Sequence, residues 1–118
     1  MQDAIWIDSD TVVLRCDCPD GVGHRYSVET VPHADSEPVA ILADVRFQRG
    51  PIREHGVNGL QNEHLLAMVK DRLESFQRGP YRCQTNEIAL KAVEAALLAM
   101  LERTRDRTSR GVEGTVAL

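Results

Sequence analysis

The chain has 118 residues, of which 42% are hydrophobic, 27% charged and 4% aromatic, a balance that predicts one small globular domain and excludes a multidomain enzyme. It contains no apolar run of transmembrane length and no secretion leader, so we expect a cytoplasmic protein that does not bind membranes. The net charge of −4 is the sum of an acidic stretch over residues 1–45, at −7, and a basic remainder, at +3. Repulsion from the acidic stretch argues against DNA as a partner and favours a small anionic ligand.

Residues 1–47 predict a mostly antiparallel sheet of about four strands. Short apolar or β-branched runs occur at 4–7, 11–14, 25–31 and 38–47. The first two runs are joined by Asp8-Ser9-Asp10, a turn sequence typical of a hairpin. A loop is expected over 48–61.

From residue 62 the apolar side chains recur at helical spacing. Asn62 is a good N-cap, and the pattern predicts a helix over about 62–78 that ends at Gly79-Pro80. A second helix is expected from about Thr85 to Ser109, followed by Gly111. A sheet, a helical hairpin over 62–110 and a C-terminal loop over 111–118 make the fold class α+β in a single domain.

The second predicted helix is longer than one small domain needs, because its roughly twenty-five residues span about 37 Å. Its alanines, which allow another backbone to approach closely, are Ala89, Ala92, Ala95, Ala96 and Ala99. We therefore expect this helix to form a dimer interface. The alternative is an Ala-rich surface helix.

Residues suited to catalysis or metal binding do not form a recognisable set. His55 and His64 have no nucleophile at motif spacing, and Cys16 and Cys18 with His24 lack the spacing of a zinc knuckle. We expect no catalytic residue, no metal and no cofactor.

Arginines near the end of the second helix are the best candidates for ligand binding. Arg103 and Arg107 lie one turn apart, with Arg110 close to the same stripe, which suits a diphosphate clamp. The alternative is a solvated ion-pair face with Glu102 and Asp106.

The segment that follows, over residues 110–115, contains two glycines that permit close approach to a ligand. Glu113 and Thr115 within it are predicted to hydrogen-bond ribose or base groups.

Three segments carry a resemblance: RFQRGPIREHGVNGLQNEHLLAMVKDRL, SFQRGPYRCQTNEIAL and ERTRDRTSRGVEGT. Their order and spacing over Arg46 to Thr115 resemble the Thoeris anti-defence sponge proteins of bacteriophages, the first such family described. The resemblance does not extend to residues 1–45.

The resemblance implies a protein that is not an enzyme. Members of that family sequester the glycocyclic ADP-ribose signal of Thoeris defence in the infected host's cytoplasm and release it unchanged on denaturation. Many form dimers that assemble into hexamers, and some hold cyclic trinucleotides of CBASS defence in separate pockets. The family's ligand contacts transfer onto Phe76, beneath a base, Asn86, a polar contact, and Arg103 and Arg107, on the diphosphate.

In such a hexamer, threefold-related copies of Arg53 form a ring of positive charge that would suit a cyclic trinucleotide. The alternative for Arg53 is an ion pair with Glu54 or with an acidic residue of the sheet.

Helix geometry adds an argument about the site. Asn86 and Arg103 are seventeen residues apart, or about 25 Å along one helix. One cyclic dinucleotide cannot contact both in a single chain, so we expect a site shared by two antiparallel helices across a twofold axis.

Two other functions remain open. A small phosphodiesterase acting on the same signals would destroy the ligand, whereas a sponge returns it intact after heating. A phage structural or interaction protein that acts through its helices would bind duplex DNA with a steep salt dependence.

Overall fold

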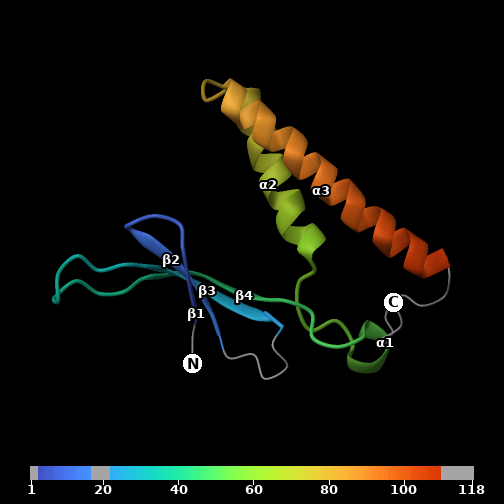
Figure 1. The fold of residues 1–118 in the computed structure, drawn as a ribbon, viewed down its shortest axis with the longest axis horizontal. Coiled ribbons are helices and arrows are strands. Elements are labelled where there is room, and N and C mark those ends of the chain that lie inside the picture. Colours follow the sequence, from blue (N-terminus) through green and yellow to red (C-terminus); the bar gives the residue numbers. More distant parts are fainter. Residues whose placement is uncertain (1–2, 17–21, 110–118) are drawn as a thin grey trace. The chain divides into compact units, whose positions relative to one another are not determined.

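The computed structural model describes residues 3–16 and 22–109 and divides into two compact units, before and after the junction of Arg49 and Gly50 (Figure 1). The first unit is a four-stranded antiparallel sheet in the order β1-β2-β3-β4. Its strands are β1 (Asp3–Trp6), β2 (Thr11–Arg15), β3 (Arg25–Thr30) and β4 (Ile41–Arg46). The predicted sheet is confirmed.

The β1–β2 connection is a turn built on one carboxylate. Asp8 Oδ1 accepts hydrogen bonds from the backbone N–H groups of Asp10 and Thr11, each at 2.8 Å, and from Thr11 Oγ1 at 2.9 Å. These hydrogen bonds, that of Asp10 above all, lower the pKa of the Asp8 carboxyl. The turn sets the register in which Trp6 pairs with Val12.

The β3–β4 pair is held by a charge pair and contains an irregularity. Arg25 Nε lies 3.1 Å from Asp44 Oδ1, and this hydrogen-bonded guanidinium lowers the pKa of Asp44. The register shifts between Val28 and Glu29. The last strand begins at Ile41, whereas the apolar run begins at Pro38, which has no N–H to donate to a ladder.

Burial in the sheet is modest. Val12 is only 7% exposed, but Trp6 and Ile41 are 64% and 67% exposed. Tyr26 and Phe47 meet edge to face, with ring centroids 5.7 Å apart.

The second unit holds the helices α1 (Ile52–His55), α2 (Asn62–Gln77) and α3 (Gln84–Ser109). The long helices α2 and α3 lie side by side as an antiparallel hairpin (Figure 1). The α+β class and the long last helix are confirmed. No helix in the described part of the chain is long and apolar enough to cross a lipid bilayer.

Two details differ from the sequence prediction. The expected loop over 48–61 contains the one-turn helix α1, which follows Pro51 and ends at Gly56, where φ is 69°. The N-cap of α2 is Gln61, and Asn62 is the first helical residue. Gln61 N–H donates to His64 Nδ1 at 2.9 Å, and the Gln61 side chain accepts from the His64 backbone, which completes a capping box.

The two long helices pack through side chains that repeat every three or four residues, as in a coiled coil. Leu90, near the middle of this seam, is 8% exposed. At one end Thr104 Oγ1 donates to Glu63 Oε2 at 3.1 Å, and at the other Gln77 Nε2 donates to Glu87 Oε2 at 3.2 Å. The remaining half-buried seam residues are Leu66, Lys70, Leu73, Asn86, Val93, Leu97 and Met100.

Candidate functional site

Four side chains gather where α2 meets α3, and we call them the turn cluster: Arg72, Phe76, Tyr81 and Asn86. The rings of Phe76 and Tyr81 have centroids 5.7 Å apart and planes inclined at 62°. Arg72 Cζ lies 4.9 Å from the Phe76 ring centroid, in cation–π contact. Asn86 Nδ2 donates to the backbone oxygen of Tyr81 at 3.1 Å. The structure thus brings Phe76 and Asn86, both predicted ligand contacts, to the same end of the hairpin.

Gln77 fastens the turn that carries this cluster. Its Oε1 accepts from Cys83 N–H and its Nε2 donates to Cys83 O, both at 3.1 Å. The same Nε2 also donates to Glu87 Oε2 on the first turn of α3. Cys83 Sγ in turn accepts from Asn86 N–H at 3.4 Å. One amide side chain therefore satisfies both backbone groups of the residue that precedes α3.

The predicted phosphate-binding arginines lie at the opposite end of α3. Arg103 has an exposed side chain and lies about 25 Å along the helix axis from Asn86. Arg107 belongs to the last part of α3, and its side chain lies outside the described residues, as do Glu113 and Thr115 altogether. A single chain therefore does not bring Asn86 and Arg103 together.

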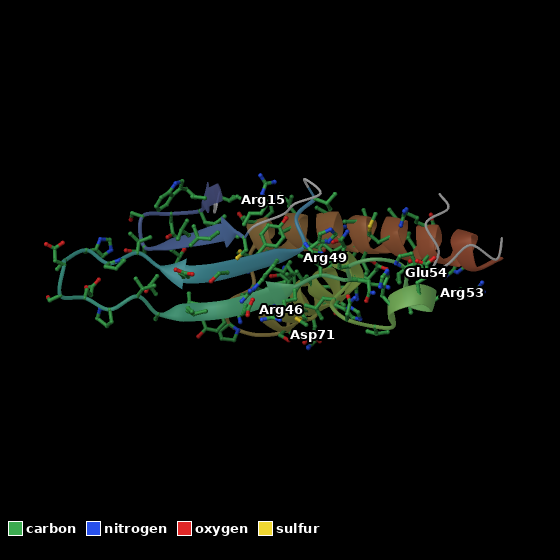
Figure 2. All side chains as sticks on the ribbon, turned by 90° about the horizontal axis from the view of Figure 1, so that it is seen from below. Arg15, Arg46, Arg49, Arg53, Glu54 and Asp71 are labelled. Atoms are coloured by element: carbon green, nitrogen blue, oxygen red, sulfur yellow. The ribbon has the colours of Figure 1, made fainter. Side chains whose placement is uncertain are left out.

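Arg53, the predicted second-pocket residue, lies on α1, next to Glu54 (Figure 2). Its side chain is exposed, as are those of Glu54 and His55. Glu54 Oε2 lies 3.9 Å from His55 Nε2. The short helix thus presents both signs of charge to solvent.

An open apolar groove of 410 Å³ lies beside the seam of the hairpin. It includes Ala96 and Ala99, two of the alanines expected at a dimer interface. The other lining residues are Asn62, Leu65, Leu66 and Met100.

Two histidines hold local structure in the described residues. His64 completes the cap of α2, and His33 Nε2 lies 2.8 Å from Asp10 Oδ1. Cys16 and Cys83 take part in no disulfide bond within the described residues, and Cys18 lies outside them.

Sequence reasoning missed three residues of this region. The sequence patterns assign no role to Tyr81, Arg72 or Gln77. The available signal was the aromatic residue directly after Gly79-Pro80, since a large apolar side chain in a short turn requires a contact.

Together these features define a helical hairpin with an aromatic and an amide at its turn and arginine at its far end. The family model for the Acb2/Tad1 hairpin domain matches residues 40–105. This match covers more than half of the chain, so the chain belongs to the Acb2/Tad1 hairpin domain family. The matched region includes β4, α1, α2 and most of α3.

The chain is also 50% identical, over 74 residues, to a protein of Bacillus phage SBSphiJ7 named Thoeris anti-defense 1. The match covers 63% of this chain and 52% of the relative, so it spans about half the relative's length. The resemblance to Thoeris anti-defence proteins is confirmed.

Proposed function

We propose that the protein is a phage anti-defence protein that binds glycocyclic ADP-ribose, the Thoeris signal, and sequesters it without cleaving it. The proposal draws on membership of the hairpin family and on the identity to Thoeris anti-defense 1. In this proposal the protein acts in the cytoplasm of the infected host, where the signal forms. A sponge must bind more tightly than the defence effector does, and nanomolar affinity corresponds to about −12 kcal/mol.

The observation that carries the proposal is that two kinds of side chain suited to ligand binding lie at opposite ends of one hairpin. The turn cluster offers an aromatic ring and an amide, which suit a base and its polar edge. The far end of α3 offers Arg103, and Arg107 one turn later, whose planar forks suit a diphosphate. Glycocyclic ADP-ribose carries its base and its diphosphate much closer together than the roughly 25 Å between Asn86 and Arg103, so in this proposal two chains supply the two groups.

Two other features of the chain favour self-association, which a site shared by two chains requires. Among the described residues, only Val12 and Leu90 are buried hydrophobic residues, at 7% and 8% exposed, which is little for a chain of 118 residues. The apolar groove beside Ala96 and Ala99 leaves room for another helix to pack closely. A twofold antiparallel pairing of α3 places Asn86 of one chain near Arg103 of its partner and makes two equivalent sites.

A second proposed pocket concerns cyclic trinucleotides of CBASS defence. Arg53 lies on an exposed one-turn helix, and if dimers assemble into a hexamer, threefold-related copies would form a ring of positive charge. A ligand with three phosphates would neutralise this ring.

Titration calorimetry with glycocyclic ADP-ribose tests the main proposal. We expect tight binding with one site per chain, and recovery of the unchanged ligand after the protein is heated and removed. Loss of the ligand during incubation would instead identify a phosphodiesterase, and failure to bind it would overturn the proposal.

A further inference from the structure

Tyr81 is the most exposed aromatic side chain of the turn cluster. Although its ring meets Phe76 at 5.7 Å, the residue is 70% exposed. Phe76 is half-buried, and the guanidinium of Arg72 lies over its ring. Tyr81 therefore presents more open aromatic surface than Phe76 does.

Hydrogen bonds hold the backbone of the turn at Tyr81 and just after it. The backbone oxygen of Tyr81 accepts from Asn86 Nδ2 at 3.1 Å, which ties the turn to α3. Two residues later, Cys83 is held by both polar atoms of the Gln77 amide. A turn whose backbone is held before binding loses little conformational entropy when a ligand binds to it.

The angle between the two rings matters for what they can bind. Their planes are inclined at 62°, so a flat base that stacks on Tyr81 on the side of Phe76 meets the Phe76 ring with its edge. The Asn86 amide uses one N–H on Tyr81 and keeps its Oδ1 as a hydrogen-bond acceptor. This corner combines an open π surface with an oriented polar atom.

We propose that Tyr81 is a second aromatic residue of the nucleotide site, on which the purine of the ligand stacks while its edge meets the ring of Phe76. This inference rests on the proposed function, whose site it extends by one residue. Removal of the ring costs the stacking of one base, which corresponds to an affinity loss of about fivefold to 150-fold.

The experiment compares Tyr81→Leu, Tyr81→Phe and Tyr81→Trp by titration calorimetry with glycocyclic ADP-ribose. Because stacking needs the ring and not the hydroxyl, Tyr81→Phe should bind within about twofold of the wild type and Tyr81→Trp at least as tightly. Tyr81→Leu should bind about fivefold to 150-fold more weakly. Rescue by the two aromatic variants separates stacking from a general need for bulk.

Tyr26→Leu is the matched control, because Tyr26 forms the other edge-to-face pair, at the same 5.7 Å, in the sheet unit. It should leave affinity unchanged. Thermal melting of each variant checks the fold, and Tyr81→Gln provides a second ring-free variant that suits an exposed turn.

The outcomes distinguish the role of Tyr81 from the proposed function of the protein. Tight wild-type binding with equal affinity in Tyr81→Leu and Tyr81→Gln would overturn the role of Tyr81 and leave the proposed function standing. An equal loss in the Phe and Leu variants would also overturn it. Absence of binding by the wild type would remove both claims.

Discussion

At the scale of single residues, three arginines of α3 allow a test of whether binding depends on the face of the helix that carries the charge or on charge alone. Arg103 and Arg107 lie on one face of the helix, whereas Arg105 is rotated about 200° from Arg103. All three carry the same charge at nearly the same height on the helix. Only the position of the guanidinium relative to a ligand distinguishes them.

We predict that Arg103→Ala and Arg107→Ala each weaken glycocyclic ADP-ribose binding by about 1.5–3 kcal/mol, because each removes a charge-assisted hydrogen bond from a diphosphate. Lysine at either position should restore little, since an ammonium lacks the two parallel donors of the fork. Arg105→Ala is the control and should bind normally in the same titration. Equal losses in all three variants would point to a general electrostatic effect and against a clamp.

Phe76 is proposed to contribute through its aromatic surface and not through charge. We predict that Phe76→Ala weakens ligand binding by about 1–3 kcal/mol through the lost aromatic contact with the base, measured by calorimetry. The fold should persist, because Phe76 lies on the last turn of α2, near the end of the hairpin, where its ring contacts Arg72 and Tyr81. A circular dichroism spectrum like that of the wild type checks this, and normal affinity would contradict the assignment.

At the scale of elements, the hairpin depends on its turn as well as on its seam. We predict that Gln77→Ala lowers the free energy of unfolding by about 1–3 kcal/mol at fixed protein concentration, because it removes hydrogen bonds to Cys83 and Glu87. Ser75→Ala, which loses two exposed hydrogen bonds, one to Asp71 O and one from Arg78 Nη2, is the control and should change stability little. Unchanged urea unfolding of Gln77→Ala would show that the turn does not depend on this amide.

The elements that could be predicted are those whose sequence repeats a physical pattern. Alternating or apolar runs located the four strands, and three- and four-residue spacing located α2 and α3 to within a residue or two. The helix α1 could not be predicted in this way, because a single turn between Pro51 and Gly56 has no periodicity.

Some residues of the candidate site could be predicted from the sequence and others could not. Phe76 and Asn86 could be carried over from a resemblance, and the structure places them together. Tyr81 and Gln77 act through contacts across a turn, and such contacts depend on how the chain reverses direction, which no local pattern encodes.

The open groove beside the seam gives α3 a second predicted role, in assembly. We predict that Ala96→Glu abolishes both self-association and ligand binding, because it places a charge in the apolar groove that another helix must fill. Ala67→Glu adds the same charge at an exposed helical alanine that does not line the groove, and should change neither property. Sedimentation and calorimetry on both variants provide the test, and a monomeric Ala96→Glu protein that still binds tightly would contradict a shared site.

At the scale of the whole molecule, the proposed ligand site belongs to the assembly, because Asn86 and Arg103 are far apart in one chain. In the proposed antiparallel dimer there are two sites, and each site takes Asn86 from one chain and Arg103 from the other. If Asn86 is substituted in one chain and Arg103 in the other, both substitutions fall in the same site and the other site keeps both native residues. A mixing experiment can detect that intact site.

We predict that Asn86→Ala and Arg103→Ala proteins, each weak alone, regain tight binding when they are mixed and allowed to exchange subunits. A mixed dimer contains one site with both substitutions and one site with none, because the intact Asn86 and the intact Arg103 meet across the axis. Random exchange makes half of the dimers mixed, so about a quarter of all sites should recover wild-type affinity. Titration calorimetry before and after exchange measures this fraction, with the Asn86→Ala protein mixed with itself as the control. If every site remains weak after exchange, each pocket belongs to one chain, and the antiparallel arrangement of α3 is wrong.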